Sequence, residues 1–422
     1  MDKFPLRVQG GQVVDRTGKR FRLKGINWYG FNDVNQAAGG LDAQKLEVIV
    51  DSIVDLGFNV IRLTFCNQML KADAVVAPDY AAKMSKVQGW PGTLSPLDVM
   101  DKVVAALGKQ GVAVFLNNHG KFREWGGMPG CNGMWHCEGY DEGVFMDDWK
   151  ALANRYKDSK NVVGYDLYNE IRPSPYFRKT NPLVPRLWPT WPGLTNWWAA
   201  VVNALGGTKA SPCWYTAVNK VGAALLEINP KALIVVERII FPARDLRPYI
   251  AQLPLPGIPL TNLVFSLHQY SWEGPDNHVP SWGAGWIERG ILGALTNTAM
   301  LGYGDIENHD EYMMWEWGYA VKEKIVPVWV NEFGAHDEME WLERTVRFFK
   351  THDCDYAWWP LNAGPKPGPA QEAEHYSVLD SDWKPLKNDR RIDLLRSLNS
   401  DAPLQPDPDW LRPGAGVSLH ED

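Results

Sequence analysis

The feature of this sequence that most limits its fold is a regular alternation of short apolar runs and longer amphipathic segments. Eight runs rich in β-branched and aromatic residues lie at 23–28, 58–65, 112–119, 161–170, 232–239, 262–270, 326–333 and 355–362. Segments with helical periodicity separate most of them, for example 42–57, 96–111, 219–230 and 339–352. Strands that are almost continuously apolar are typical of a parallel sheet covered on both faces. The pattern therefore predicts an α/β fold, a single closed (β/α)8 TIM barrel.

The remaining segments indicate how the chain is divided. No strand-like run is followed by a GxGxxG turn, so a doubly wound open sheet is disfavoured. The first residues predict a short β-hairpin, with turns at Gly10-Gly11 and Thr17-Gly18. No repeat or linker divides the chain before about residue 400. We predict one barrel domain over 1–400 and a loosely packed Pro- and Asp-rich tail over 401–422.

Three connections in this barrel are unusually long. They follow the second, fourth and sixth strands, at about 66–95, 171–213 and 269–311. In a (β/α)8 barrel, loops of this kind lie at the end where the carboxyl ends of the strands meet, and active sites are built there. We therefore expect the functional residues at this end.

Tryptophan is unusually frequent, with 21 residues in 422. Many of these residues stand in Pro- and Gly-rich stretches such as 187–198, where a flat apolar ring more often meets a ligand than a core. Sugar rings have an apolar face and polar edges, so a carbohydrate is the expected partner. We predict that at least two of five loop tryptophans are partly exposed beside the site: Trp125, Trp135, Trp188, Trp191 and Trp272.

The charge balance and the missing motifs exclude several function classes. A net charge of −7 with no basic stripe argues against a nucleic-acid partner. The sequence contains no apolar run long enough for a membrane span, and its first residues lack the layout of a secretory signal. We expect a secreted protein whose signal was removed, with a cytoplasmic location as the alternative. No zinc motif, HExxH, EF-hand loop or P-loop is present, so we expect neither a metal nor a cofactor.

The cysteines leave the compartment open. Five cysteines are too few for a disulfide scaffold. Cys131 and Cys137 could close a local disulfide, which would place the protein outside the cytoplasm. Two free thiols in a reducing compartment are the alternative.

Polar residues stand at the ends of several apolar runs, where a core would not place them. They are Arg62, His119, Asn169, Glu170, His268, Tyr270 and Glu332. Each alone could be a structural group, but a barrel brings them all to one mouth. Glycoside hydrolysis needs one carboxyl group as a proton donor and a second as a nucleophile or base, and Glu170 and Glu332 can supply them. Arg62 can keep Glu332 ionised.

The same positions resemble glycoside hydrolase family 5, the cellulase family of retaining β-glycosidases. The matching motifs are IRL at 61–63, NNH at 117–119, NE at 169–170, HQY at 268–270 and NEFG at 331–334. The similarity covers essentially the whole barrel, from 24–32 to 356–362. The long segment that follows NNH looks most like the cellulase-like branch of the family.

This resemblance implies a role for each matching residue. Glu170 matches the acid/base, Glu332 the nucleophile and Arg62 the residue that supports the nucleophile. The other implied sugar-binding residues are Asn169, His119, His268, Tyr270, Trp359, Trp28, Trp125 and Trp272. A cis peptide bond at Trp359-Pro360 is also expected, since the family commonly has one after its tryptophan. Tyr168, which precedes Asn169, and the long Trp-rich loops depart from the family pattern.

We therefore predict a retaining β-glycoside hydrolase, in the first place an endo-β-1,4-glucanase that acts as a monomer on a β-linked oligo- or polysaccharide. β-Mannan, β-1,3-glucan and glycolipid substrates remain alternatives for the same machinery. A non-catalytic sugar-binding barrel is the alternative from a different class, although both glutamates are present. We expect the two carboxyl groups about 5–5.5 Å apart, the spacing of retaining enzymes.

Overall fold

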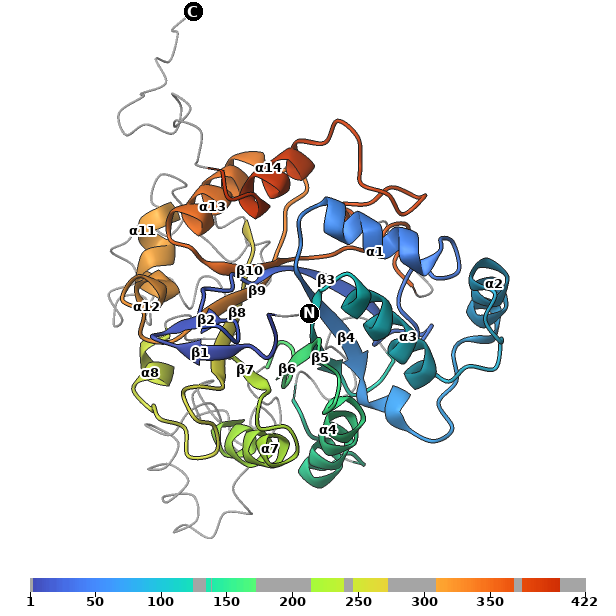
Figure 1. The fold of residues 1–422 in the computed structure, drawn as a ribbon, viewed down its shortest axis with the longest axis horizontal. Coiled ribbons are helices and arrows are strands. Elements are labelled where there is room, and N and C mark those ends of the chain that lie inside the picture. The colour runs from blue at the N-terminus through green and yellow to red at the C-terminus, as the bar shows by residue number, and fades with distance from the viewer. Residues whose placement is uncertain are drawn as a thin grey trace, which may run out of the picture.

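The fold is a closed barrel of parallel strands surrounded by helices (Figure 1). The computed structural model describes residues 3–123, 134–137, 139–171, 214–238, 246–271, 309–367 and 374–402. The barrel strands follow the chain order: β3 (Lys24–Phe31), β4 (Val60–Cys66), β5 (Ala113–Gly120), β6 (Val162–Asp166), β7 (Leu233–Glu237), β8 (Leu263–Gln269), β9 (Val328–Phe333) and β10 (Asp355–Trp358). The barrel closes where β10 pairs with β3. The predicted (β/α)8 barrel is confirmed, and each expected run overlaps one strand.

Helices of the described regions surround the strands (Figure 1). They are α1 (Leu46–Asp55), α3 (Pro96–Lys109), α4 (Glu142–Tyr156), α7 (Trp214–Ile228), α8 (Arg247–Ile250), α11 (His309–Met313), α12 (Tyr319–Lys322), α13 (Met339–Thr351) and α14 (Arg390–Asn399). A π-helix, Met314–Gly318, joins α11 to α12. The long connection after β4 contains a 3-10 turn, Asn67–Leu70, and a helix, α2 (Pro78–Gln88). Most of the long connections after β6 and β8, and the tail from 403, lie outside the described residues.

Local sequence signals fix several helix ends. At the start of α3, the Ser95 side chain accepts a hydrogen bond from the Asp98 amide, and the Asp98 carboxylate accepts one from the Ser95 amide. Pro96 follows at the first helical position, where its missing N–H costs nothing. Helix α2 ends at Gly89, whose φ of 74° lies in the left-handed region that glycine adopts easily.

The predicted hairpin is formed by β1 (Arg7–Gln9) and β2 (Gln12–Val14). Gly10 and Gly11 make its two-residue turn, and both have positive φ, as a type I′ turn requires. Apolar side chains of this N-terminal region share one buried cluster with residues that line the barrel interior, including Val60, Phe115 and Trp329. The hairpin region therefore packs against the apolar barrel interior at the amino ends of the strands. The opposite end of the barrel is left for polar residues.

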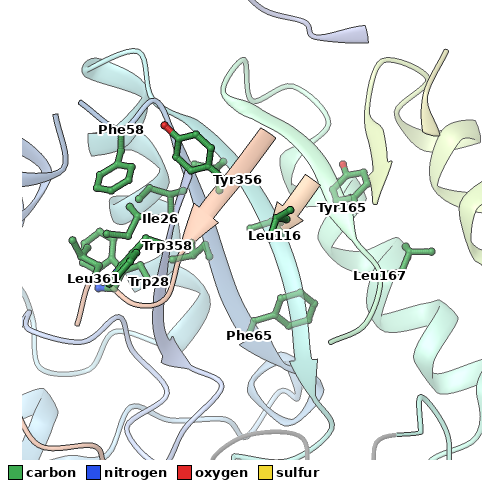
Figure 2. Packing of buried hydrophobic residues seen from close by; sticks show 14 of the residues in the cluster. Ile26, Trp28, Phe58, Phe65, Leu116, Tyr165, Leu167, Tyr356, Trp358 and Leu361 are labelled. Carbon is green, nitrogen blue, oxygen red and sulfur yellow. The ribbon is translucent and has the colours of Figure 1, made fainter. Parts of the chain in front are cut away.

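Alternation along each strand separates two environments. In β4, Ile61, Leu63 and Phe65 belong to the large core between the barrel and its helices. Arg62, between them, points into the barrel and contacts residues of other strands. Figure 2 shows the outer core, in which residues from several strands gather. The inward side chains are apolar near the amino ends of the strands and polar near their carboxyl ends. The site therefore lies at the carboxyl end of the strands.

Candidate active site

Glu332 and Glu170 come from strands on different sides of the barrel. Glu332 is part of β9 and is buried, whereas Glu170 follows β6 and has a side chain that is 24% exposed. One carboxylate oxygen of each residue lies within 4.8 Å of the other. Although 162 positions separate them in the sequence (332 − 170), the parallel strands bring both carboxylates to one mouth. The two groups are therefore close enough to act on a single bond.

Arg62, inside the barrel, contacts Glu332 and also Asn169, the neighbour of Glu170. Its guanidinium is fully buried and donates to Asp166 Oδ2 at 2.6 Å and to Glu332 Oε1 at 2.5 Å. It also donates to the side-chain oxygens of Asn27 (3.0 Å) and Asn169 (2.8 Å). Burial opposes its charge, but the surrounding carboxylates raise the pKa of Arg62, so it remains a cation.

Two opposing effects set the ionisation of Glu332. Burial raises the pKa of Glu332 above its ordinary value of 4.5, while the positive charges of His268 and Arg62 oppose that shift. Tyr270 also contacts this carboxylate, because its hydroxyl donates to Glu332 Oε2 at 3.1 Å. Glu332 is thus a carboxylate with donors on both oxygens, which suits a nucleophile held in one orientation.

His268, at the end of β8, lies between the two glutamates. Its Nδ1 is 3.3 Å from Glu170 Oε1 and 3.4 Å from Glu332 Oε2. On the other side of the ring, Nε2 is 3.4 Å from Glu237 Oε1. Burial disfavours its charge, but the neighbouring carboxylates outweigh burial and raise the pKa of His268 to about 9. The imidazole is therefore a cation at neutral pH.

Aromatic rings form one wall of the mouth. Trp359 stacks on Tyr29, with ring centroids 5.7 Å apart, and on His119, with centroids 5.2 Å apart and the planes inclined by only 6°. His119 Nδ1 lies 2.9 Å from Asn117 Oδ1. Burial, and then the charge of Arg62, hold the pKa of His119 well below its usual range, so this imidazole is neutral. The expected cis bond at Trp359-Pro360 is confirmed.

The same donors could in principle approach a metal ion. Glu170, His268 and Glu332 each offer one atom, and these atoms lie within 4.8 Å of one another. However, the Arg62 guanidinium already contacts Glu332, and the protonated imidazole lies between the carboxylates. We therefore interpret the cluster as an ion-pair network whose positive charge comes from the protein.

Comparison with known proteins agrees with this geometry. The sequence profile of the family described as Cellulase (glycosyl hydrolase family 5) matches residues 14–365. The chain belongs to glycosyl hydrolase family 5. This family 5 glycosidase is 27% identical to an endoglucanase of Paenibacillus polymyxa over 373 residues, which cover 84% of this chain and 79% of the relative. It is also 27% identical to the major extracellular endoglucanase of Xanthomonas campestris pv. campestris over 406 residues, which cover 92% and 69%.

Solved structures show the same fold at low identity. The catalytic domain of the Xanthomonas endoglucanase superposes with a TM-score of 0.67 at 24% identity, covering 93% of this chain and 99% of that one. A complex of a Pyrococcus horikoshii endocellulase with cellotetraose gives 0.69 at 24% identity, covering 94% and 98%. These likenesses support the barrel fold.

The structure brings together most of the sequence-predicted site residues of the family 5 enzyme. Seven strand-end residues and Trp359 surround the mouth or support it: Arg62, His119, Asn169, Glu170, His268, Tyr270, Glu332 and Trp359. Their roles toward substrate remain predictions. Trp125 and Trp272 lie outside the described residues.

Trp28 was wrongly expected to bind sugar. Its side chain points out of the barrel into the core that Figure 2 shows, and it is fully buried. Its indole N–H donates to the Gly39 carbonyl at 3.0 Å. The inward position on β3 is the preceding residue, Asn27, because side chains alternate along a strand. Trp28 therefore supports the barrel wall.

The exposed-tryptophan prediction can be examined at one of its five positions. Trp135 is fully buried, and its indole N–H donates to Glu142 at 3.2 Å. It therefore does not contribute an exposed ring. The other four residues, Trp125, Trp188, Trp191 and Trp272, lie outside the described residues, so the rest of the prediction remains open.

Three buried polar residues of this network were missed from the sequence. Asn27, Asp166 and Glu237 all point into the barrel and contact Arg62. Glu237 ends an apolar run, as Glu332 nearly does, and this signal could have identified it. Asp166 and Asn27 stand inside their apolar runs. Only the alternation of inward and outward side chains along a strand shows that they face the barrel interior.

Tyr168, the departure from the family pattern, helps to hold the end of strand β6. Its hydroxyl donates to the Met134 carbonyl at 2.9 Å. The ammonium of the buried Lys121 lies 5.1 Å from its ring centre and 4.1 Å from that of Phe145. These contacts tie the residues after β5 to the strand end that carries Asn169 and Glu170.

Two further findings concern the cysteines and membranes. Cys137 is disulfide-bonded, whereas Cys66 and Cys354 are free. Its partner lies outside the described residues, as do both Cys131 and Cys213, so the Cys131–Cys137 pairing remains a prediction.

In the part of the chain that the structure describes, no helix is long and apolar enough to cross a membrane.

Proposed function

We propose that this family 5 glycosidase is a retaining endo-β-1,4-glucanase. The observation that carries the proposal is the approach of Glu170 and Glu332, with one oxygen of each within 4.8 Å of the other. Retaining glycosidases hold their two carboxyl groups about 5–5.5 Å apart, whereas inverting ones need about 6.5–9.5 Å to admit a water molecule beneath the sugar. The close approach favours direct attack by a carboxylate.

The reaction then proceeds in two displacements. In the first, a Glu332 oxygen attacks the anomeric carbon, the glycosidic C–O bond breaks, and Glu170 gives its proton to the leaving oxygen. In the second, Glu170 takes a proton from water, the water oxygen attacks the same carbon, and the ester to Glu332 breaks. Both residues return to their starting states, so no cofactor or metal is needed.

The surrounding contacts fit these roles. Arg62 and Tyr270 donate to different oxygens of Glu332, which fixes the orientation of the nucleophile. Asn169 is held by Arg62 through its side-chain oxygen, so its amide N–H2 group remains to contact a sugar hydroxyl. Trp359 supplies a flat apolar surface on which a sugar ring can stack.

The substrate assignment rests on relatives. Two relatives are named endoglucanases, and a structural neighbour is a complex with cellotetraose. β-Mannan, β-1,3-glucan and glycolipids remain the other candidates for the same two glutamates. A non-catalytic sugar-binding barrel is disfavoured because both glutamates are present and supported by donors.

We also propose that the protein is secreted and monomeric. A disulfide at Cys137 fits an oxidising compartment, and one relative is named a major extracellular endoglucanase. The monomer is retained from the sequence prediction, and size-exclusion chromatography with light scattering would test it.

The test is a panel of defined β-1,4-gluco-, β-1,4-manno- and β-1,3-gluco-oligosaccharides and β-glycolipids, with product analysis. We expect internal cleavage of cellopentaose with the highest kcat/KM. Glu332→Gln should abolish turnover and still bind cellotetraose in calorimetry. A higher kcat/KM on another class would replace the proposed substrate. Full activity in Glu332→Gln would remove the proposed mechanism.

A further inference from the structure

Glu237 is a buried carboxylate beneath the proposed catalytic pair, and the reaction described above does not use it. It is the last residue of β7 and points into the barrel, with only 1% of its surface exposed. Its Oε1 accepts a hydrogen bond from the Glu170 backbone N–H at 3.0 Å and lies 3.4 Å from His268 Nε2. Its Oε2 lies 3.8 Å from Arg62. A single carboxylate thus contacts the backbone of one proposed catalytic residue and the side chain between both.

The contact with Glu170 concerns an unusual backbone conformation. Glu170 has a φ of 49°, in the left-handed region that a residue with a side chain adopts only with backbone strain. Its amide N–H donates into the barrel, to Glu237. The preceding amide, of Asn169, donates to the Asn118 carbonyl at 2.8 Å. These two hydrogen bonds anchor the turn that directs the Glu170 side chain toward the mouth.

The contact with His268 concerns charge. Nδ1 of His268 faces both Glu170 and Glu332, while Nε2 faces Glu237. Each ring nitrogen of the protonated imidazole therefore lies within 3.4 Å of a carboxyl oxygen, and the carboxyl groups on both sides of the ring favour its positive charge. Without a carboxylate near Nε2, the protonated form of the imidazole would be less favoured between Glu170 and Glu332.

We propose that Glu237 is a positioning residue of the reaction, which fixes the Glu170 backbone and keeps His268 charged between the two catalytic carboxylates. This inference rests on the proposed function. It assigns no contact between Glu237 and substrate.

Other charges around the imidazole must be counted as well. They come from neighbouring strands: Arg62 of β4 and Arg238 after β7, whose guanidinium lies 3.5 Å from the His268 carbonyl oxygen. The imidazole of His119 on β5 also lies near His268, and it is neutral. Burial raises the pKa of Glu237 as well, while the positive charges of His268 and Arg62 oppose that shift, so the ionised form of Glu237 depends in turn on the charge of His268. Asp166 of β6 adds negative charge near Glu237. Of the individual electrostatic interactions that raise the pKa of His268, the one with the Glu237 charge is the largest. Neutralising Glu237 should therefore lower the pKa of His268.

The experiment uses two substitutions in the full chain. Glu237→Gln keeps an oxygen that can accept from the Glu170 amide but removes the charge, whereas Glu237→Leu removes both. The control is Glu343→Gln, which neutralises another buried glutamate, on the outer helix α13, whose carboxylate pairs with Arg390 of α14 and with no residue of the mouth. Unfolding in urea shows whether each variant is folded at the assay temperature.

The expected results separate charge from positioning. In Glu237→Gln, NMR of the labelled imidazole should show the pKa of His268 lowered by about 1–3 units from about 9, and the control should leave it unchanged. In Glu237→Leu, kcat/KM for cellotetraose should fall by about 10- to 100-fold, and by much less for an activated aryl cellobioside, because a displaced Glu170 donates its proton poorly.

Two results would overturn the inference. One is a His268 pKa that does not change in Glu237→Gln. The other is an equal loss of activity on both substrates in Glu237→Leu, which indicates a purely structural role. The proposed function is judged separately, by the anomeric configuration that the unmodified enzyme produces and by Glu332→Gln.

Discussion

Arg62 is completely buried, yet it hydrogen-bonds two carboxylates and two side-chain amides at the mouth of the barrel. A buried charge is costly unless partners compensate it, and here Asp166 and Glu332 do so. The planar guanidinium can reach both at once, which a lysine ammonium could not do with the same geometry. At the residue scale, the site is thus an ion network in which each charge is held by its neighbours.

The pH dependence of the unmodified enzyme follows from Glu332. The nucleophile must be ionised, so kcat/KM is lost as pH falls through its pKa. Because burial raises the pKa of Glu332 above 4.5, we expect the acid limb of the kcat/KM profile to lie above pH 4.5. A profile measured with an activated aryl cellobioside gives the limb directly. Undiminished kcat/KM at pH 4 would contradict this expectation.

A second residue-scale prediction concerns the proton donor. Glu170→Ala should lower kcat/KM for cellotetraose by about 10²–10⁴-fold, because the leaving alcohol then departs without a proton. A 2,4-dinitrophenyl cellobioside needs little protonation, so its kcat/KM should fall much less. Steady-state kinetics on both substrates make the comparison. Equal losses would mean that Glu170 is not the acid.

At the scale of single elements, the alternation of side chains along a strand decides which residues face the barrel mouth and which face the outer core. In β3, Asn27 points inward to Arg62, and Trp28 points outward to the core. In β10 and just beyond it, Trp358 is in the outer core and Trp359 lies at the mouth. The resemblance to the family led us to expect Trp359 beside the other site residues, and it packs on His119 there, although its role toward sugar stays a prediction. Trp28 was misplaced, because an apolar run looks the same from both faces when both are covered.

The aromatic wall yields a prediction for substrate binding. Trp359→Ala should weaken cellotetraose binding about tenfold or more, which corresponds to about 1.4 kcal/mol, because the apolar face of a sugar ring loses its support. The measurement is calorimetric titration in a Glu332→Gln background, so that no turnover interferes. Trp359→Phe is the matched control and should retain most of the affinity. Unchanged binding by the alanine variant would remove Trp359 from the sugar site.

The cap of α3 provides a contrasting test, because it affects a helix outside the barrel. Ser95→Ala removes the side-chain acceptor for the Asp98 amide and should lower the free energy of unfolding by about 0.5–2 kcal/mol. Urea denaturation measures that loss. The kcat/KM for cellotetraose should not change, since α3 contributes no residue to the mouth. A parallel loss of activity would show that the helix and the site are coupled.

At the scale of the whole molecule, the sequence predicted the architecture well. Eight apolar runs became eight barrel strands, and the Gly10-Gly11 turn formed the hairpin. The two glutamates were found because a carboxylate at the end of a buried strand is unusual. Glu237 satisfies the same rule but was missed, because no motif drew attention to its strand. Its role depends on distances between strands, and these arise only when the barrel closes.

The central claim is that Glu332 attacks the anomeric carbon, and its most direct test is the configuration of the first product. Proton NMR recorded during early hydrolysis of cellopentaose, before mutarotation, distinguishes the two anomers at the new reducing end. A retaining enzyme must release the β-anomer first, and this is the result that the close approach of Glu170 and Glu332 predicts. Initial release of the α-anomer would contradict the assignment of both residues.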